Sequence, residues 1–184
     1  MRYLILCTFV FCSVFGLQNA AADQNDKHLD ILFKLLHKTD NTYEGAEITR
    51  QIWFRWQESD NSDVENLMER GIIHMQHREY QKALNVFSNI TEIAPSFAEG
   101  WNKRATVYFL MGDLENSTRD VDQTLALEPR HFGAIAGQGY IYLKRGDRLS
   151  AMTQFKKALN LNPFLTDLKS QIQQLETQLR RSIV

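Results

Sequence analysis

The chain has 184 residues, with 21 basic and 22 acidic side chains and a formal net charge of −1 at pH 7. This length allows one domain or one repeat array with a buried core. A hydrophobic content of 43% with 23% charged residues is typical of a folded protein and excludes global disorder. The near-zero charge argues against a nucleic-acid partner, because such binding depends on neutralising phosphates.

The N-terminus, residues 1–22, is predicted to be a secretory signal peptide. Arg2 is followed by an apolar run over 3–17 and then by three alanines that suit cleavage after residue 22. The run is shorter than the roughly 20 apolar residues of a membrane span. An uncleaved signal that tethers the chain to a membrane is the alternative. Both cysteines, Cys7 and Cys12, lie in this segment, so the exported chain has no thiol for disulfides, catalysis or metal binding.

The segment 23–63 is predicted to form a degenerate helical hairpin. Its first part has apolar residues at helical spacing, namely Leu29, Leu32 and Leu36. Asn41 and Glu44 resemble a capping box at the start of a second helix.

The three prolines, Pro95, Pro129 and Pro163, are spaced 34 residues apart. The same step aligns small residues in two columns, which are Gly71, Ala105, Gly139 and Ala83, Ser117, Ala151. It also aligns bulky apolar residues, for example Phe87, Val121 and Phe155. A fixed period of this length indicates an internal repeat, with units at 64–97, 98–131 and 132–165.

These residues resemble the tetratricopeptide repeat (TPR) family, whose unit is a pair of antiparallel helices with small residues where they cross. The resemblance implies an all-α, right-handed solenoid of stacked helix pairs, in which the two small-residue columns face each other. Gly112 and Gly146 mark tight turns between the paired helices, and Arg78 departs from this pattern in the first unit. The segments 99–117 and 126–134 also resemble exported, largely uncharacterised TPR proteins of alphaproteobacteria. We therefore expect the bacterial periplasm as the location.

The hairpin at 23–63 also shares features with the repeats. Tyr43 and Ala46 stand at the same offset as Tyr80 and Ala83 of the first unit. We therefore expect a fourth, atypical unit at the end of the array, as is usual for terminal repeats. The two tryptophans of its second helix, Trp53 and Trp56, are expected to pack it onto the first unit.

The C-terminal segment 166–184 is predicted to be a capping helix. Its apolar stripe consists of Leu168, Ile172, Leu175 and Leu179 among polar residues. The alternative is that this stripe mediates self-association, which would make the chain a structural subunit.

No catalytic pattern is present. The sequence lacks G-x-S-x-G, H-E-x-x-H, a P-loop and C-x-x-C-H, so we predict no enzyme, no cofactor and no metal site. His74 and His77 are three residues apart, but no third ligand is suitably placed. An enzyme with an unrecognised site is a remote alternative, which a perturbed carboxylate or histidine in an occluded pocket would favour.

The resemblance implies that the first helices of the units line a concave groove that binds a protein or peptide. The expected groove residues are Met68, Ile72, Met75, Gln76, Asn102, Thr106, Phe109, Leu110, Ala136, Tyr140, Leu143 and Lys144. This lining is mainly apolar. TPR cochaperones that clamp the C-terminal carboxylate of heat-shock chaperones use Lys and Asn where this chain has Met68 and Ile72, which argues against that role. The alternative to an open groove is one filled by the termini, with the C-terminal stripe as the filler.

Overall fold

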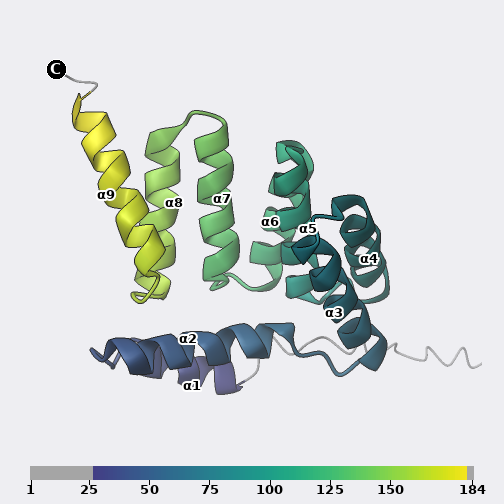
Figure 1. Ribbon diagram of the computed structural model, residues 1–184. Coiled ribbons are helices and arrows are strands. Elements are labelled where there is room, and N and C mark those ends of the chain that lie inside the picture. Colours follow the sequence, from purple (N-terminus) through teal and green to yellow (C-terminus); the bar gives the residue numbers. More distant parts are fainter. Residues whose placement is uncertain (1–26, 182–184) are drawn as a thin grey trace, which may run out of the picture.

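A computed structural model describes residues 27–181 of the chain, and these residues form nine helices and no strand. The predicted signal peptide lies outside the described residues. The helices are α1 (Lys27–Leu36), α2 (Thr42–Gln57), α3 (Ser62–Gln76), α4 (Tyr80–Ile93), α5 (Ala98–Met111), α6 (Leu114–Leu127), α7 (Phe132–Lys144), α8 (Arg148–Leu161) and α9 (Thr166–Arg181). The pairs α3/α4, α5/α6 and α7/α8 stack in succession (Figure 1). The predicted all-α solenoid is confirmed. None of the described helices is both long and apolar enough to cross a membrane.

The small residues lie where the paired helices cross. A Cβ atom on Gly71 would come within 2.5 Å of the buried Phe87 ring, and one on Gly139 within 2.4 Å of the Phe155 ring. The middle pair has Ala105 and Val121 at the corresponding positions. A larger residue on the first helix thus goes with a smaller one on the second, which keeps the helices close.

The turn between paired helices contains a residue with positive φ in each unit. Gly112 has φ +83° and Gly146 has φ +81°, the left-handed conformation that glycine adopts without a steric penalty. Arg78 adopts the same conformation, with φ +58°. The first unit therefore carries backbone strain that the other two avoid.

The helix that follows each of these turns begins differently in the first unit. The Asp113 carboxylate accepts a hydrogen bond from the Asn116 N–H at 3.1 Å, and Asp147 makes the same type of N-cap at the start of α8. Glu79 makes no such cap and instead contacts His74 Nδ1 at 2.6 Å and Lys82 Nζ at 2.8 Å.

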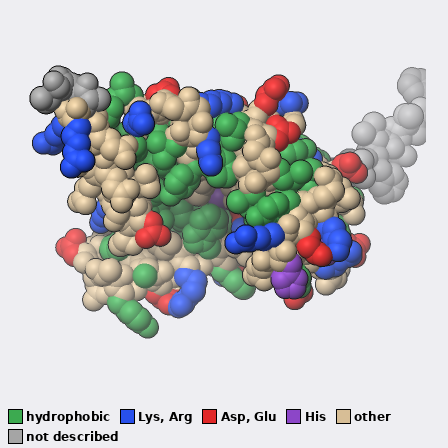
Figure 2. All heavy atoms as spheres, turned by 45° about the horizontal axis from the view of Figure 1, so that its top comes forward, with side chains coloured by type: hydrophobic (Ala, Val, Ile, Leu, Met, Phe, Trp, Pro, Cys, Tyr) green, Lys and Arg blue, Asp and Glu red, His purple; other side chains and the backbone are tan. Residues whose placement is uncertain are grey.

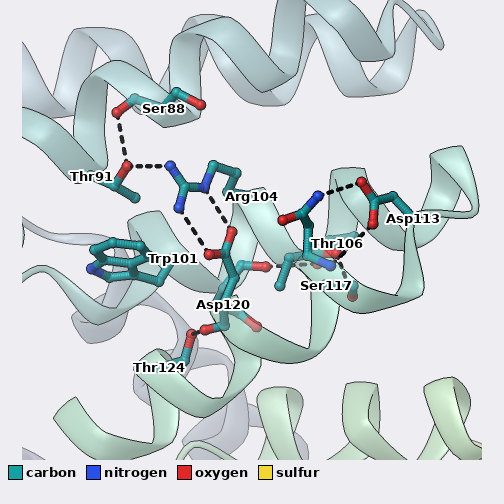
Figure 3. Close-up of polar contacts among 12 residues, drawn as sticks. Ser88, Thr91, Trp101, Arg104, Thr106, Asp113, Ser117, Asp120 and Thr124 are labelled. Carbon is teal, nitrogen blue, oxygen red and sulfur yellow. Dashed lines mark hydrogen bonds and ion pairs between the residues drawn. The ribbon is translucent and has the colours of Figure 1, made fainter.

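A polar cluster joins the first two units (Figure 3). Arg104 of α5 donates two hydrogen bonds to the Asp120 carboxylate of α6, at 2.7 and 2.9 Å, and a third to Thr91 of α4 at 2.7 Å. Its guanidinium also lies 4.7 Å from the ring centre of Trp101. A bidentate, half-buried ion pair of this kind fixes the orientation of α5 and α6 relative to each other.

The N-terminal hairpin α1/α2 does not stack on the first unit. It runs crosswise below α7, α8 and α9, along the loops that connect the repeats (Figure 1). Near the start of α2, Gly45 lies against the ring of Phe164, and Thr49 exchanges hydrogen bonds with Asn162. The expected packing of Trp53 and Trp56 onto the first unit is therefore wrong.

The loop between α6 and α7 explains this placement. Arg130 in that loop binds Asp30 of α1 at 2.6 Å, and its guanidinium lies 4.9 Å from the ring centre of Phe33. Arg130 is itself held by two hydrogen bonds to the buried carboxylate of Glu128. The first inter-repeat loop has Ala94 where this loop has Glu128, so it offers no such anchor.

The repeat-like register expected for the hairpin is also wrong. Ala46 is exposed and Tyr43 is 83% exposed, whereas the neighbouring Gly45 is buried. The reason is that the hairpin packs on loops rather than on a helix pair. The capping box is half formed, because Asn41 accepts the Glu44 N–H at 3.0 Å while the Glu44 carboxylate accepts from Thr39.

Helix α9 packs against α8 at the end of the solenoid. Leu168, Ile172 and Leu175 are buried in the same core cluster as Phe155. The apolar stripe therefore packs on the last repeat, and none of its residues lines the pocket between α5 and α7.

Candidate binding site

A concave pocket of about 320 Å³ lies between α5 and α7. Six of the expected groove residues line it, which are Asn102, Thr106, Phe109, Leu110, Ala136 and Tyr140. Five further residues that were not expected complete it, namely Ala105, Ser117, Val121, Gly133 and Gly137. No lining residue is charged. Hydrophobic side chains gather in the hollow at the centre of the face shown in Figure 2.

A small residue on α7 leaves open space on the pocket side of the helix. A Cβ atom added to Gly137 would meet no heavy atom within 4 Å except Val121 Cγ2, at 4.0 Å, so this side of α7 faces open space. The run of glycines around position 137 was the sequence signal that could have identified this pocket. An exposed surface with such a hollow can accept an apolar side chain.

Two aromatic residues form the walls. Tyr140 is 37% exposed, and its ring packs against Phe155 with centres 5.0 Å apart. Burial and the nearby Asp167 carboxylate raise the pKa of the Tyr140 hydroxyl above its ordinary value. On the opposite wall, the Lys144 ammonium lies 5.9 Å from the ring centre of Phe109.

A second pocket, of about 480 Å³, lies between α2 and α3. It contains the expected groove residues Met68, Ile72 and Gln76. The unexpected residues are Phe54, Gln57, Glu58, Glu65, Glu69 and Ile73. Part of the lining of this second pocket comes from α2, and the repeat pattern does not predict the position of that helix.

Three expected groove residues line neither pocket. Met75 packs against the core of the first unit, and Leu143 packs against the large core cluster. Lys144 is exposed and reaches the site only through its contact with Phe109.

The hairpin packs against Gly133, a residue that lines the α5–α7 pocket. The Trp53 ring lies against the backbone of Gly133, where a Cβ atom would be 2.3 Å from it. Beside it, the ring of Trp56 stacks on His131. The Lys103 ammonium lies 5.8 Å from the ring centre of Trp53.

A buried polar network lies beside this contact. His131 Nδ1 accepts the Ala134 N–H at 3.0 Å, which places the ring proton on Nε2, 2.9 Å from the carboxylate of Glu99. Glu99 also accepts a hydrogen bond from Asn102 and pairs with Lys103 at 2.8 Å. Burial opposes ionisation of Glu99, but the Lys103 charge and the His131 hydrogen bond outweigh it and hold the pKa of Glu99 at about 2.

Asn102 is the member of this network that lines the pocket, and Glu99 and His131 do not reach its surface. The side chains of Glu99 and His131 are both 0% exposed, so a perturbed carboxylate is present but cannot meet a substrate. Within residues 27–181, no group of three or more His, Cys, Asp or Glu side chains could hold a metal ion. The accessible chemistry of the site is the binding of apolar groups.

Comparisons with known proteins agree with this architecture. Residues 134–164 match the family described as tetratricopeptide repeat. A TPR repeat-containing protein of Rhizobium etli is 27% identical over 162 residues, covering 88% of this chain and 79% of that protein. DnaJ homolog subfamily C member 3 of Mus musculus is 30% identical over 129 residues, but the chain spans only 24% of its length.

A solved structure has the same fold. The first TPR domain of Spaghetti, bound to the HSP90 peptide SRMEEVD, has a TM-score of 0.58 at 18% identity, covering 62% of this chain and 90% of that domain. The family match at 134–164, the similarity to the Rhizobium etli protein, the 34-residue period and the stacked helix pairs together indicate a protein built of tetratricopeptide repeats, and the solved structure shows the same fold.

Proposed function

We propose that the chain is a non-enzymatic, exported scaffold or adaptor that binds a protein or peptide partner through its concave surface. The observation that supports this most strongly is the uncharged α5–α7 pocket, which is open at Gly137 and walled by Phe109 and Tyr140. The peptide bound by the similarly folded Spaghetti domain supports the same use of the fold.

The size of the pocket sets the kind of contact. Burying one Leu or Phe side chain contributes about 1.5–3 kcal/mol, which is too little for stable binding alone. A partner therefore needs further contacts along the surface. The pocket between α2 and α3 provides a second place for them.

The location forms part of the proposal. The Arg2, apolar and alanine-rich parts of the N-terminal sequence support export to the bacterial periplasm. Fractionation of the native cells, with the N-terminal residue of the recovered chain determined by mass spectrometry, tests this. Recovery of an intact chain in the cytoplasm contradicts it.

Alanine variants test the binding proposal. Phe109→Ala and Tyr140→Ala remove the two pocket walls, and each is expected to reduce partner recovery in affinity purification. Tyr43→Ala and Leu149→Ala are matched controls, because both residues are exposed large apolar residues outside the two pockets. Equal recovery by folded wall and control variants contradicts the proposal.

A further inference from the structure

The pocket between α2 and α3 exposes an unusual amount of apolar surface. Phe54 of α2 is 62% exposed and Ile73 of α3 is 42% exposed, and both line the pocket together with Ile72. Exposure of large apolar groups to water is unfavourable, so covering those in this open pocket lowers the free energy.

The charged residues that line this pocket all have one sign. Glu58, Glu65 and Glu69 line it, and no Lys, Arg or His does. Glu58 pairs with Arg55 at 2.8 Å. Among the described residues, Glu65 and Glu69 have no ion-pair partner within 4 Å.

The spacing of the two unpaired carboxylates strengthens the negative potential at this pocket. Glu65 and Glu69 are four residues apart on α3, so they lie on the same face of the helix and repel each other. A cationic group placed at this rim relieves the repulsion and complements the negative potential. The α5–α7 pocket has no charged lining residue, so this preference belongs to the α3 end of the concave surface.

We infer that the pocket between α2 and α3 binds a basic, apolar segment of the partner, with an apolar side chain against Phe54 and Ile73 and lysine or arginine beside Glu65 and Glu69. This inference rests on the proposed function, because it names the chemical class of the partner that the concave surface takes. The segment lies across the first helices of the repeats and fills the uncharged pocket with a second apolar side chain.

Peptide binding tests the inference. The probe is an array of short random peptides with one fixed phenylalanine, exposed to the purified full-length chain. Peptides with Lys or Arg beside apolar residues are expected to be retained. Replacing their basic residues with Glu is expected to weaken binding at least about tenfold in fluorescence anisotropy, the effect of two modest ion pairs replaced by repulsion.

Variants of the chain locate the effect. The double change Glu65→Gln, Glu69→Gln is expected to weaken binding of the basic peptides about tenfold, and Glu65→Lys, Glu69→Lys to reverse the preference. Glu115→Gln is the control, because Glu115 is an exposed glutamate in the first turn of α6, as Glu65 is in α3. All of these residues are exposed, so circular dichroism is expected to show an unchanged helical fold.

The outcomes separate this inference from the proposed function. If Gly137→Leu, which fills the α5–α7 pocket, leaves all peptide binding unchanged, the proposed function fails. If binding depends on Gly137 but shows no preference for basic peptides, the proposed function stands and this inference is overturned. It is also overturned if the changes at Glu65 and Glu69 alter only sedimentation of the chain, because the occupant is then a second copy.

Discussion

The imidazole of His131 stacks on the indole of Trp56, with ring centres 4.1 Å apart and planes inclined by 12°. His131 also caps α7 and contacts Glu99 of α5, so one residue joins the N-terminal hairpin to two repeats. The hairpin is therefore tied to the helices that line the α5–α7 pocket. The contact lies beside the fully buried carboxylate of Glu99.

That carboxylate makes stability depend on pH. The pKa of Glu99 is about 2 in the folded chain, against an ordinary value of 4.5. Because folding lowers its pKa, the ionised Glu99 carboxylate stabilises the fold above pH 4.5, and this stabilisation is lost as the pH falls toward 2. The contribution at neutral pH is on the order of 3 kcal/mol.

We expect Glu99→Gln to lower the free energy of unfolding at pH 7 by on the order of 3 kcal/mol, with the difference from wild type shrinking below pH 4.5. Urea denaturation at a series of pH values measures this. Glu115→Gln is the exposed control. A constant difference between the Glu99→Gln and wild-type chains at all pH values counts against a paired, ionised Glu99.

Two glycines on one helix give opposite predictions for the same substitution. At Gly137 there is room for a Cβ atom, so Gly137→Ala is expected to raise the free energy of unfolding by about 0.5–1 kcal/mol. Gly139→Ala pushes a methyl group into the buried Phe155 ring and is expected to cost about 1–3 kcal/mol. Denaturant titration compares them, and equal effects would show that the crossing at Gly139 is not tight.

Arg78 provides a third prediction. Because it has φ +58°, Arg78→Gly is expected to stabilise the chain by about 1 kcal/mol. Gly112→Ala, at φ +83° in the matching turn, is expected to destabilise it by a similar amount. Thermal unfolding of both variants checks the pair. A loss of stability in Arg78→Gly would mean that the arginine side chain outweighs the strain of its backbone.

The hairpin placement predicts a contrast between neighbouring residues. Gly45→Val puts a side chain into the Phe164 ring, whereas Ala46→Val adds atoms to an exposed site. Only the first change is expected to release α1 and α2, which faster amide hydrogen exchange in 27–57 reports. Similar exchange in the two variants contradicts docking of α2 on the loop at 162–165.

The repeats were predictable because each unit uses the same local devices. The prolines end the second helices, Gly112 and Gly146 form the turns, and the small residues mark the crossings. These signals recur every 34 residues, so they reinforce one another.

The position of the hairpin was not predictable in this way. Its partners, including Arg130 and His131, lie in a loop whose sequence indicates only a turn. Their pairing with Asp30 and Trp56 spans 100 and 75 residues of chain and follows no period. The predicted groove residues of α5 and α7 include Phe109 and Tyr140, which line the α5–α7 pocket, but the prediction did not include Phe54, Gly133 or Gly137.

The proposed binding site for the partner is the α5–α7 pocket. The most direct measurement is photo-crosslinking in the native cells from a benzoylphenylalanine at position 110, on the pocket rim, in otherwise wild-type chain and in Gly137→Leu. We predict a discrete adduct from the wild-type chain that is lost in Gly137→Leu, and no such adduct from position 43. An adduct of equal yield in Gly137→Leu would contradict the claim.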